Sequence, residues 1–162
     1  MTDTLRSICE QCPHLNNPQL DFLSEGFSRH KEIILRDLVE LVSAASAELA
    51  KTVIILSGSL LEAVLYSFIQ CQTDFISKFI GEEFKFNPDH SLENYVRTFN
   101  KYFGGILPNA VVPIRVVGYR DLVHINRELN SLTDVCAQAS RDMLRILNVL
   151  LGELSQFANP QP

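Results

Sequence analysis

The sequence predicts an all-α protein, an antiparallel four-helix-type bundle with additional short helices. Residues 52–71 are apolar on nearly every face, over a length that suits a buried central helix. No stretch carries a strand signal. Near the C-terminus, apolar residues recur at spacings of four and three, as in the seam of an antiparallel bundle: Leu132, Cys136, Ala139, Met143, Ile146 and Leu150.

Length and composition favour one domain. The chain has 162 residues, of which 46% are hydrophobic and 20% charged, enough for a core without disulfides or metal. Residues 1–16 are expected to form an N-terminal arm with about one helical turn. We expect residues 17–156 to form a single helical domain and residues 157–162 a disordered tail.

The first helical region is predicted to begin at Asn17-Pro18, where Asn caps the helix and Pro takes its first position. Apolar residues follow at mostly helical intervals to Leu41, with Gly26 as a candidate bend, so the region is one long helix or two short ones. Residues 43–47 offer no large side chain to bury, which places the first turn there.

The second helix is expected at about 48–71, in the centre of the bundle. Its apolar length also suits a transmembrane span. Glu62 lies at its middle, serines recur along it, and Lys51 is the only closely flanking cation. These features favour a buried core helix over a membrane span.

The boundaries of the later helices are predicted from capping and helix-breaking residues. A helical continuation is expected to end at Gly81, with a loop over 82–89, and Ser91 is placed to cap a helix through Phe103. Because of Pro113, the helix that carries Arg120 is expected to begin at or after residue 113. The last helix is expected over about 132–155.

The net charge of −5 argues against a protein that coats nucleic acid through many phosphate contacts. Residues 1–90 carry 7 Lys/Arg against 13 Asp/Glu, a net charge of −6, and residues 91–162 carry 7 against 6, a net charge of +1. The second half would therefore meet any polyanion.

Four cysteines, Cys9, Cys12, Cys71 and Cys136, occur without a basic stretch followed by an apolar run at the N-terminus. Reduced thiols in a cytoplasmic protein are the expectation. Cys9 and Cys12, followed by His14, have half of a zinc spacing but no second close pair. We expect no metal and no cofactor.

Arg120 and His124 are the candidate functional pair. In a helix they stand one turn apart, so a fixed cation and a titratable imidazole share one face. Such pairs also arise by chance on solvated helix surfaces. The pair suits a site that handles a phosphodiester.

Two stretches resemble the HEPN superfamily of small α-helical bundles. Residues 55–63 (ILSGSLLEA) are similar to its central-helix signature, and residues 119–124 (YRDLVH) resemble its Arg-polar-x-x-His site. Fewer residues separate Arg120 from His124 than is usual in the active members, and Asp121 stands where Asn is commoner. The resemblance implies a HEPN-like bundle, commonly a homodimer.

The resemblance implies metal-independent cleavage of RNA, by attack of a ribose 2′-hydroxyl on its own phosphate. His124, with an ordinary pKa of about 6.5, would act as general base or acid. Arg120 would stabilise the charge of the transition state. Because one His cannot remove and donate a proton at the same moment, a second copy at a dimer cleft would supply another His124.

For the residues that would support this pair, the sequence leaves alternative roles. Asp121 would either orient the imidazole or pair with Arg120. Glu62 would contact Arg120 or His124, or else lie at a solvent-exposed edge or bond another loop. Asn126 and Arg127 follow on the next turn, as supporting residues or as solvated surface.

The leading expectation is a cytoplasmic endoribonuclease or RNA-binding effector of stress or phage defence. Its expected partners are a second copy of the chain, RNA, and an antitoxin or a nucleotidyltransferase-type protein, with no membrane. The alternative is a non-catalytic helical module that binds a partner protein or a nucleotide.

Overall fold

A computed structural model of the chain describes residues 4–121 and 133–158. All regular elements in these ranges are helices, which confirms the predicted all-α class. The longer helices are α3 (Ser28–Ser46), α4 (Ala50–Cys71), α6 (Leu92–Phe103) and α9 (Thr133–Ala158). The shorter ones are α1 (Leu5–Glu10), α2 (Pro13–Asn16), α5 (Thr73–Ile80), α7 (Arg115–Asp121) and the 3-10 turns η1 (Glu25–Phe27) and η2 (Pro108–Ala110).

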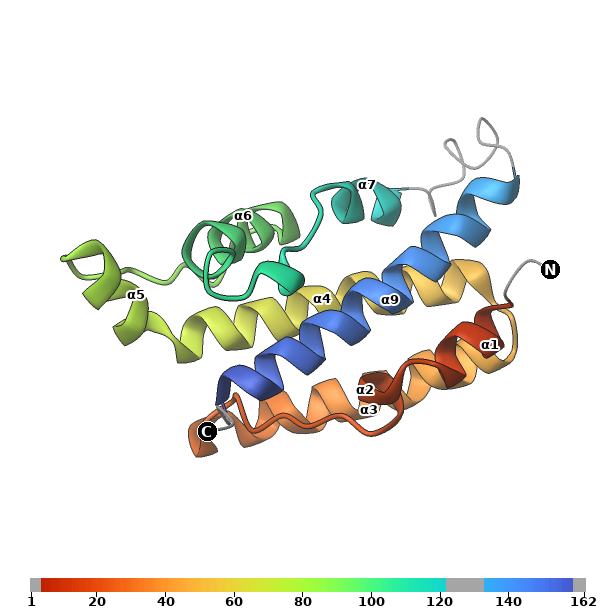
Figure 1. Ribbon diagram of the computed structural model, residues 1–162, viewed down its shortest axis with the longest axis horizontal. Coiled ribbons are helices and arrows are strands. Elements are labelled where there is room, and N and C mark those ends of the chain that lie inside the picture. Colours follow the sequence, from red (N-terminus) through yellow and green to blue (C-terminus); the bar gives the residue numbers. More distant parts are fainter. Residues whose placement is uncertain (1–3, 122–132, 159–162) are drawn as a thin grey trace.

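The central helix is α4, as its apolar sequence predicts. It packs against α3, α6, α7 and α9, and Figure 1 shows it running through the middle of the molecule. The ring of Phe68 joins its neighbours, with centroids 6.0 Å from Phe22, 4.9 Å from Phe103 and 5.8 Å from Phe157. Phe68 of α4 therefore contacts three parts of the fold: the segment that precedes α3, the helix α6 and the helix α9.

Among the described residues, α4 is the one helix long and apolar enough to cross a membrane by length and composition. Within the bundle, 61% of its most apolar stretch is buried. The other helices thus supply the apolar surroundings that its side chains need.

The predicted N-terminal arm contains two short helices that contribute to the core. Leu5 and Ile8 of α1 and Leu15 of α2 are buried, and both helices pack on α3 and α9. The backbone N–H of His14 donates to Asn148 Oδ1 at 2.9 Å. A Cβ at Gly152 would lie 2.7 Å from His14 Nε2, so a larger residue at position 152 would require the His14 side chain to move.

The predicted helix start at Asn17-Pro18 is wrong. Residues 17–24 are not helical, and α3 begins at Ser28. Leu20 and Leu23 are buried nonetheless. Their apolar spacing, which suggested a helix, reflects burial against the bundle by an irregular segment.

The remaining boundaries agree closely with the capping residues. The turn after α3 falls at 47–49, later than the predicted 43–47, because residues 43–46 still belong to α3. α5 ends at Ile80, and Gly81 after it has a left-handed φ of 75°. The Oγ of Ser91 accepts from the Asn94 N–H at the start of α6. The helix that carries Arg120 begins at Arg115, after Pro113, and α9 extends from 133 to 158. Leu132 lies outside the described residues.

Glu48 fixes the turn between α3 and α4 to the N-terminal helices. Its carboxylate accepts hydrogen bonds from the backbone N–H groups of Leu5 and Arg6, each at 3.0 Å, at the open end of α1. The bond from Arg6 is the main cause that lowers the Glu48 pKa. Glu48 also has a φ of 58°, the left-handed region that a side chain disfavours. To make these hydrogen bonds, Glu48 therefore adopts a backbone conformation that costs free energy.

Glu48→Ala is expected to lower the free energy of unfolding at neutral pH by about 1 kcal/mol, the usual cost of losing a helix cap. Glu48→Gly loses the same contact but relieves the left-handed backbone, so it should be more stable than Glu48→Ala. Urea unfolding measures both, with Glu40→Ala on the exposed face of α3 as control.

The stabilisation by Glu48 should also depend on pH. Because its folded pKa is lowered from 4.5, its contribution is present above that value and is lost as the pH falls through the folded pKa. The difference between wild type and Glu48→Ala should vanish in acid. A difference that is constant with pH would contradict the capping role.

Candidate functional site

The helix that carries the candidate pair is α7. Arg120 and Asp121 occupy its last two positions, while their side chains lie outside the described part of the structure. His124, Asn126 and Arg127 also lie outside the described residues. The placement of α7 is therefore what the structure contributes to the site.

Two side chains of α7 fix its position on the bundle. Val116 is fully buried, and α7 packs against both α4 and α9. The hydroxyl of Tyr119 donates to Asp142 Oδ2 of α9 at 2.8 Å, and Gln138 Nε2 donates to the other carboxylate oxygen at 2.9 Å. Since Tyr119 precedes Arg120 directly, this bond sets the rotation of the helix at the candidate site.

The surroundings of Tyr119 keep its hydroxyl protonated. Burial raises its pKa, and the hydrogen bond to Asp142 and the charge of that carboxylate raise it further. Arg115, one turn earlier on α7, acts in the opposite direction. The neutral phenol is thus the form that donates to Asp142.

Glu62 is partly buried on α4, the helix on which α7 packs. It also lies near the phenol of Tyr95 on α6. Burial is the main cause that raises the Tyr95 pKa, and the charges of Tyr66 and Glu62 add to it. The predicted contacts of Glu62 with Arg120 or His124 involve side chains outside the described part.

Cys9 and Cys12 are both buried and free. Burial raises the pKa of both thiols, that of Cys12 to about 11. Since metals and electrophiles need the thiolate, these cysteines are suited to packing at neutral pH. In residues 4–121 and 133–158, no group of three His, Cys, Asp or Glu side chains is placed to hold a metal ion.

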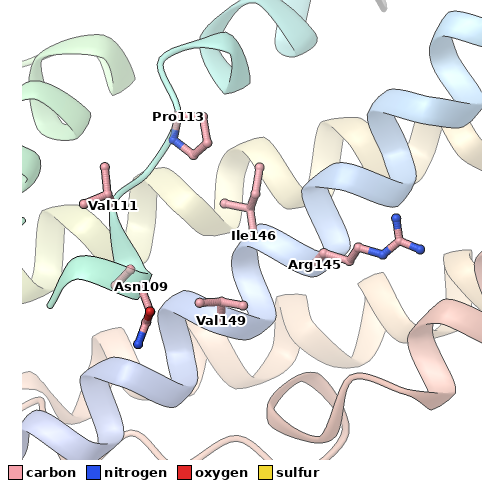
Figure 2. Close-up of a pocket in the computed structure, with 7 residues that line it drawn as sticks. Asn109, Val111, Pro113, Arg145, Ile146 and Val149 are labelled. Atoms are coloured by element: carbon pink, nitrogen blue, oxygen red, sulfur yellow. The ribbon is translucent and has the colours of Figure 1, made fainter.

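A groove that the sequence analysis missed lies between the segment 109–113 and α9, and Figure 2 shows residues from both sides of it. It has a volume of about 240 Å³. Asn100 holds the segment in place, because its side-chain amide donates to the Val112 carbonyl at 2.8 Å and accepts from the Val112 N–H at 2.9 Å. The lining residues are Asn109, Ala110, Val111, Pro113, Arg145, Ile146 and Val149.

The groove could have been suspected from one signal in the sequence. Val149 lies outside the apolar seam of the last helix, and in the structure 40% of it is exposed. Val111 across the groove is 44% exposed. One exposed apolar side chain is ordinary, whereas apolar side chains that face each other across a groove are typical of a contact surface.

Comparison of the chain with models of protein families, with curated proteins and with solved structures finds no match in any of the three.

Tyr119→Phe is expected to lower the free energy of unfolding by about 1 kcal/mol, because the Asp142 carboxylate loses a donor in a half-buried position. In a double-mutant cycle with Asp142→Ala, the two changes should be non-additive by about 0.5–1.5 kcal/mol. Urea unfolding of the four proteins measures this coupling. Additive effects would mean that the bond does not hold α7.

Proposed function

We propose that this chain is a HEPN-like protein that binds RNA and cleaves it without a metal ion, using Arg120 and His124 from two copies. One observation carries the proposal. The helix α7, which contains the first part of the 119–124 stretch, packs on α4, which contains the 55–63 stretch. The helices that carry these two stretches are therefore in contact, which supports the proposal.

The proposed chemistry needs only these side chains and the substrate. His124 of one copy takes the proton of a ribose 2′-hydroxyl, and the 2′-oxygen forms a bond to the adjacent phosphorus. The bond from phosphorus to the 5′-oxygen breaks, and His124 of the other copy protonates that leaving oxygen. Arg120 donates two hydrogen bonds to the phosphate as charge builds on it. The products are a cyclic 2′,3′-phosphate and a 5′-hydroxyl.

A second candidate is a non-catalytic module that binds a partner protein, such as an antitoxin or a nucleotidyltransferase. It is favoured by an apolar groove of about 260 Å³ between α2 and α3, where Leu35 and Val39 are 42% and 67% exposed. Surfaces of this kind are typical of protein contacts. Under this alternative, the protein would act in the cytoplasm without cleaving RNA.

Purified protein incubated with end-labelled RNA and a chelator should release fragments with cyclic phosphate ends. Arg120→Ala is expected to reduce the cleavage rate about 100-fold or more, because a charge that stabilises the transition state is lost. His124→Ala should reduce it about 100-fold or more through loss of proton transfer. Gel analysis of the fragments measures both rates.

The matched controls are Arg97→Ala and His90→Gln. Arg97 lies on α6, where it pairs with Glu93, and His90 packs beside Tyr95, so neither belongs to the proposed site. Both variants should cleave at the wild-type rate. Cleavage undiminished in His124→Ala would reject the mechanism, and no cleavage at any pH would favour the partner-binding alternative.

A further inference from the structure

We propose that a second copy of this chain packs on the open face of α4, with the two α4 helices antiparallel about a two-fold axis between Ile55 and Ser59. The open face of α4 consists of Thr52, Ile55 and Ser59. The inference rests on the proposed function, because it assigns the surface through which the two copies of the site meet.

The open face is a side of α4 that the described neighbours leave exposed. Thr52, Ile55 and Ser59 are exposed, with Ile55 at 48%, and their spacings of three and four place them along one side of the helix. Within one copy, only 61% of the most apolar stretch of α4 is buried. A second copy would therefore cover apolar surface of the central helix that one bundle leaves in contact with water.

Tyr66 shows which elements border the open face. It lies on the same side of α4, seven positions after Ser59. Its ring stacks on His30 of α3, with centroids 5.8 Å apart, and meets the ring of Tyr95 of α6 edge-on at 5.8 Å. The open face thus lies between α3 at one edge and α6 at the other.

The helix α7 follows α6 along the same edge. Both helices pack on α4, and Figure 1 shows them on the same side of it, with α7 nearer than α6 to the N-terminal end of α4. Ile55 and Ser59 belong to the N-terminal half of α4. The edge of the open face at these two residues is therefore the edge on which the site helix lies.

The register of α7 turns the candidate site toward the open face. Tyr119 reaches α9 through its bond to Asp142, and Val116 is buried against the bundle. Round the helix axis, Val116 lies about 60° from Tyr119, and position 120 lies about 100° from it in the same sense. Position 120 is therefore on the side of α7 that is turned from α9 and toward the open face of α4.

A two-fold axis perpendicular to α4 brings the two copies of α7 together. Such an axis makes the two α4 helices antiparallel and keeps both α7 helices at the same edge of the contact, where they face each other. An axis parallel to α4 would instead place them at opposite edges. The antiparallel pair is thus the one compatible with a cleft that Arg120 and His124 of both copies share.

The centre of the open face suits a contact between two identical helices. With the axis between Ile55 and Ser59, Ile55 of each copy lies against Ser59 of the other, so a large side chain meets a small one. The three residues of the face carry no charge, whereas RNA is held mainly through cations at its phosphates. A centre depleted of charge is typical of a protein interface, so the face favours a protein occupant over RNA.

Charges placed on the open face test the proposal. Ile55→Glu and Ser59→Arg each bury an unpaired charge in the contact, so we expect the dissociation constant of the dimer to rise about tenfold or more for each. Sedimentation equilibrium across a concentration series measures it. Both positions are exposed in one copy, so urea unfolding of the monomer should show little change in its free energy of unfolding.

A mixture of the two variants tests the antiparallel register. In a heterodimer, the carboxylate of Ile55→Glu faces the guanidinium of Ser59→Arg, and the other half of the contact is unchanged. Heterodimers should therefore form at lower concentration than either homodimer, and native mass spectrometry resolves them by mass. Heterodimers no tighter than the homodimers would overturn this register.

The matched controls carry the same changes at exposed positions elsewhere. Ile106, in the turn after α6, is 46% exposed, and Ser24 is exposed in the segment before α3. Ile106→Glu and Ser24→Arg should dimerise like the wild type. Equal weakening by these controls would mean that added charge acts without regard to the surface, which would overturn the assignment.

The outcomes distinguish this surface from the proposed function. A wild-type dimer that ignores Ile55→Glu and Ser59→Arg would overturn the open face as the contact and leave a two-copy site intact. A strict monomer at all concentrations would overturn this contact and the two-histidine mechanism together. RNA cleavage that persists in monomeric Ile55→Glu would reject the two-copy mechanism while supporting the open face as the contact.

Discussion

Burial of α4 is the constraint on which the rest of the structure depends. Its apolar side chains need cover on several faces, and α3, α6, α7 and α9 each supply a part of it. Burying a side chain such as Phe68 contributes about 1.5–3 kcal/mol. The same requirement brings α7 to its position, because Val116 is buried where α7 meets the bundle. The site helix is thus placed by the packing of the core.

Periodicity and caps predict the long elements well because those signals are local. The apolar run of α4, the Ser91 cap of α6 and the seam of α9 each determine their helix within a few residues. Residues 17–24 were mispredicted because tertiary contacts bury their side chains without a helix. The helices α1 and α2 are too short to show a full period, and Glu48, distant in sequence, caps α1.

In the candidate site, too, some features follow from local sequence signals and others depend on tertiary contacts. Its residue types could be found from spacing and resemblance, and so could the start of α7 after Pro113. The hydrogen bond between Tyr119 and Asp142 joins residues 23 positions apart on different helices, so no local pattern in the sequence predicts it. The groove beside α9 is indicated in the sequence only by Val149, which lies off the apolar seam, whereas its shape depends on how Asn100 holds the neighbouring segment.

The most direct test of the central claim is histidine NMR during titration with a short RNA whose 2′-oxygen at the cleavage site is blocked. The chain has four histidines, at positions 14, 30, 90 and 124. RNA is expected to shift the imidazole signal of His124, while the signals of the other three histidines stay in place. An unmoved His124 signal at saturating RNA, or a shift confined to the other histidines, would contradict it.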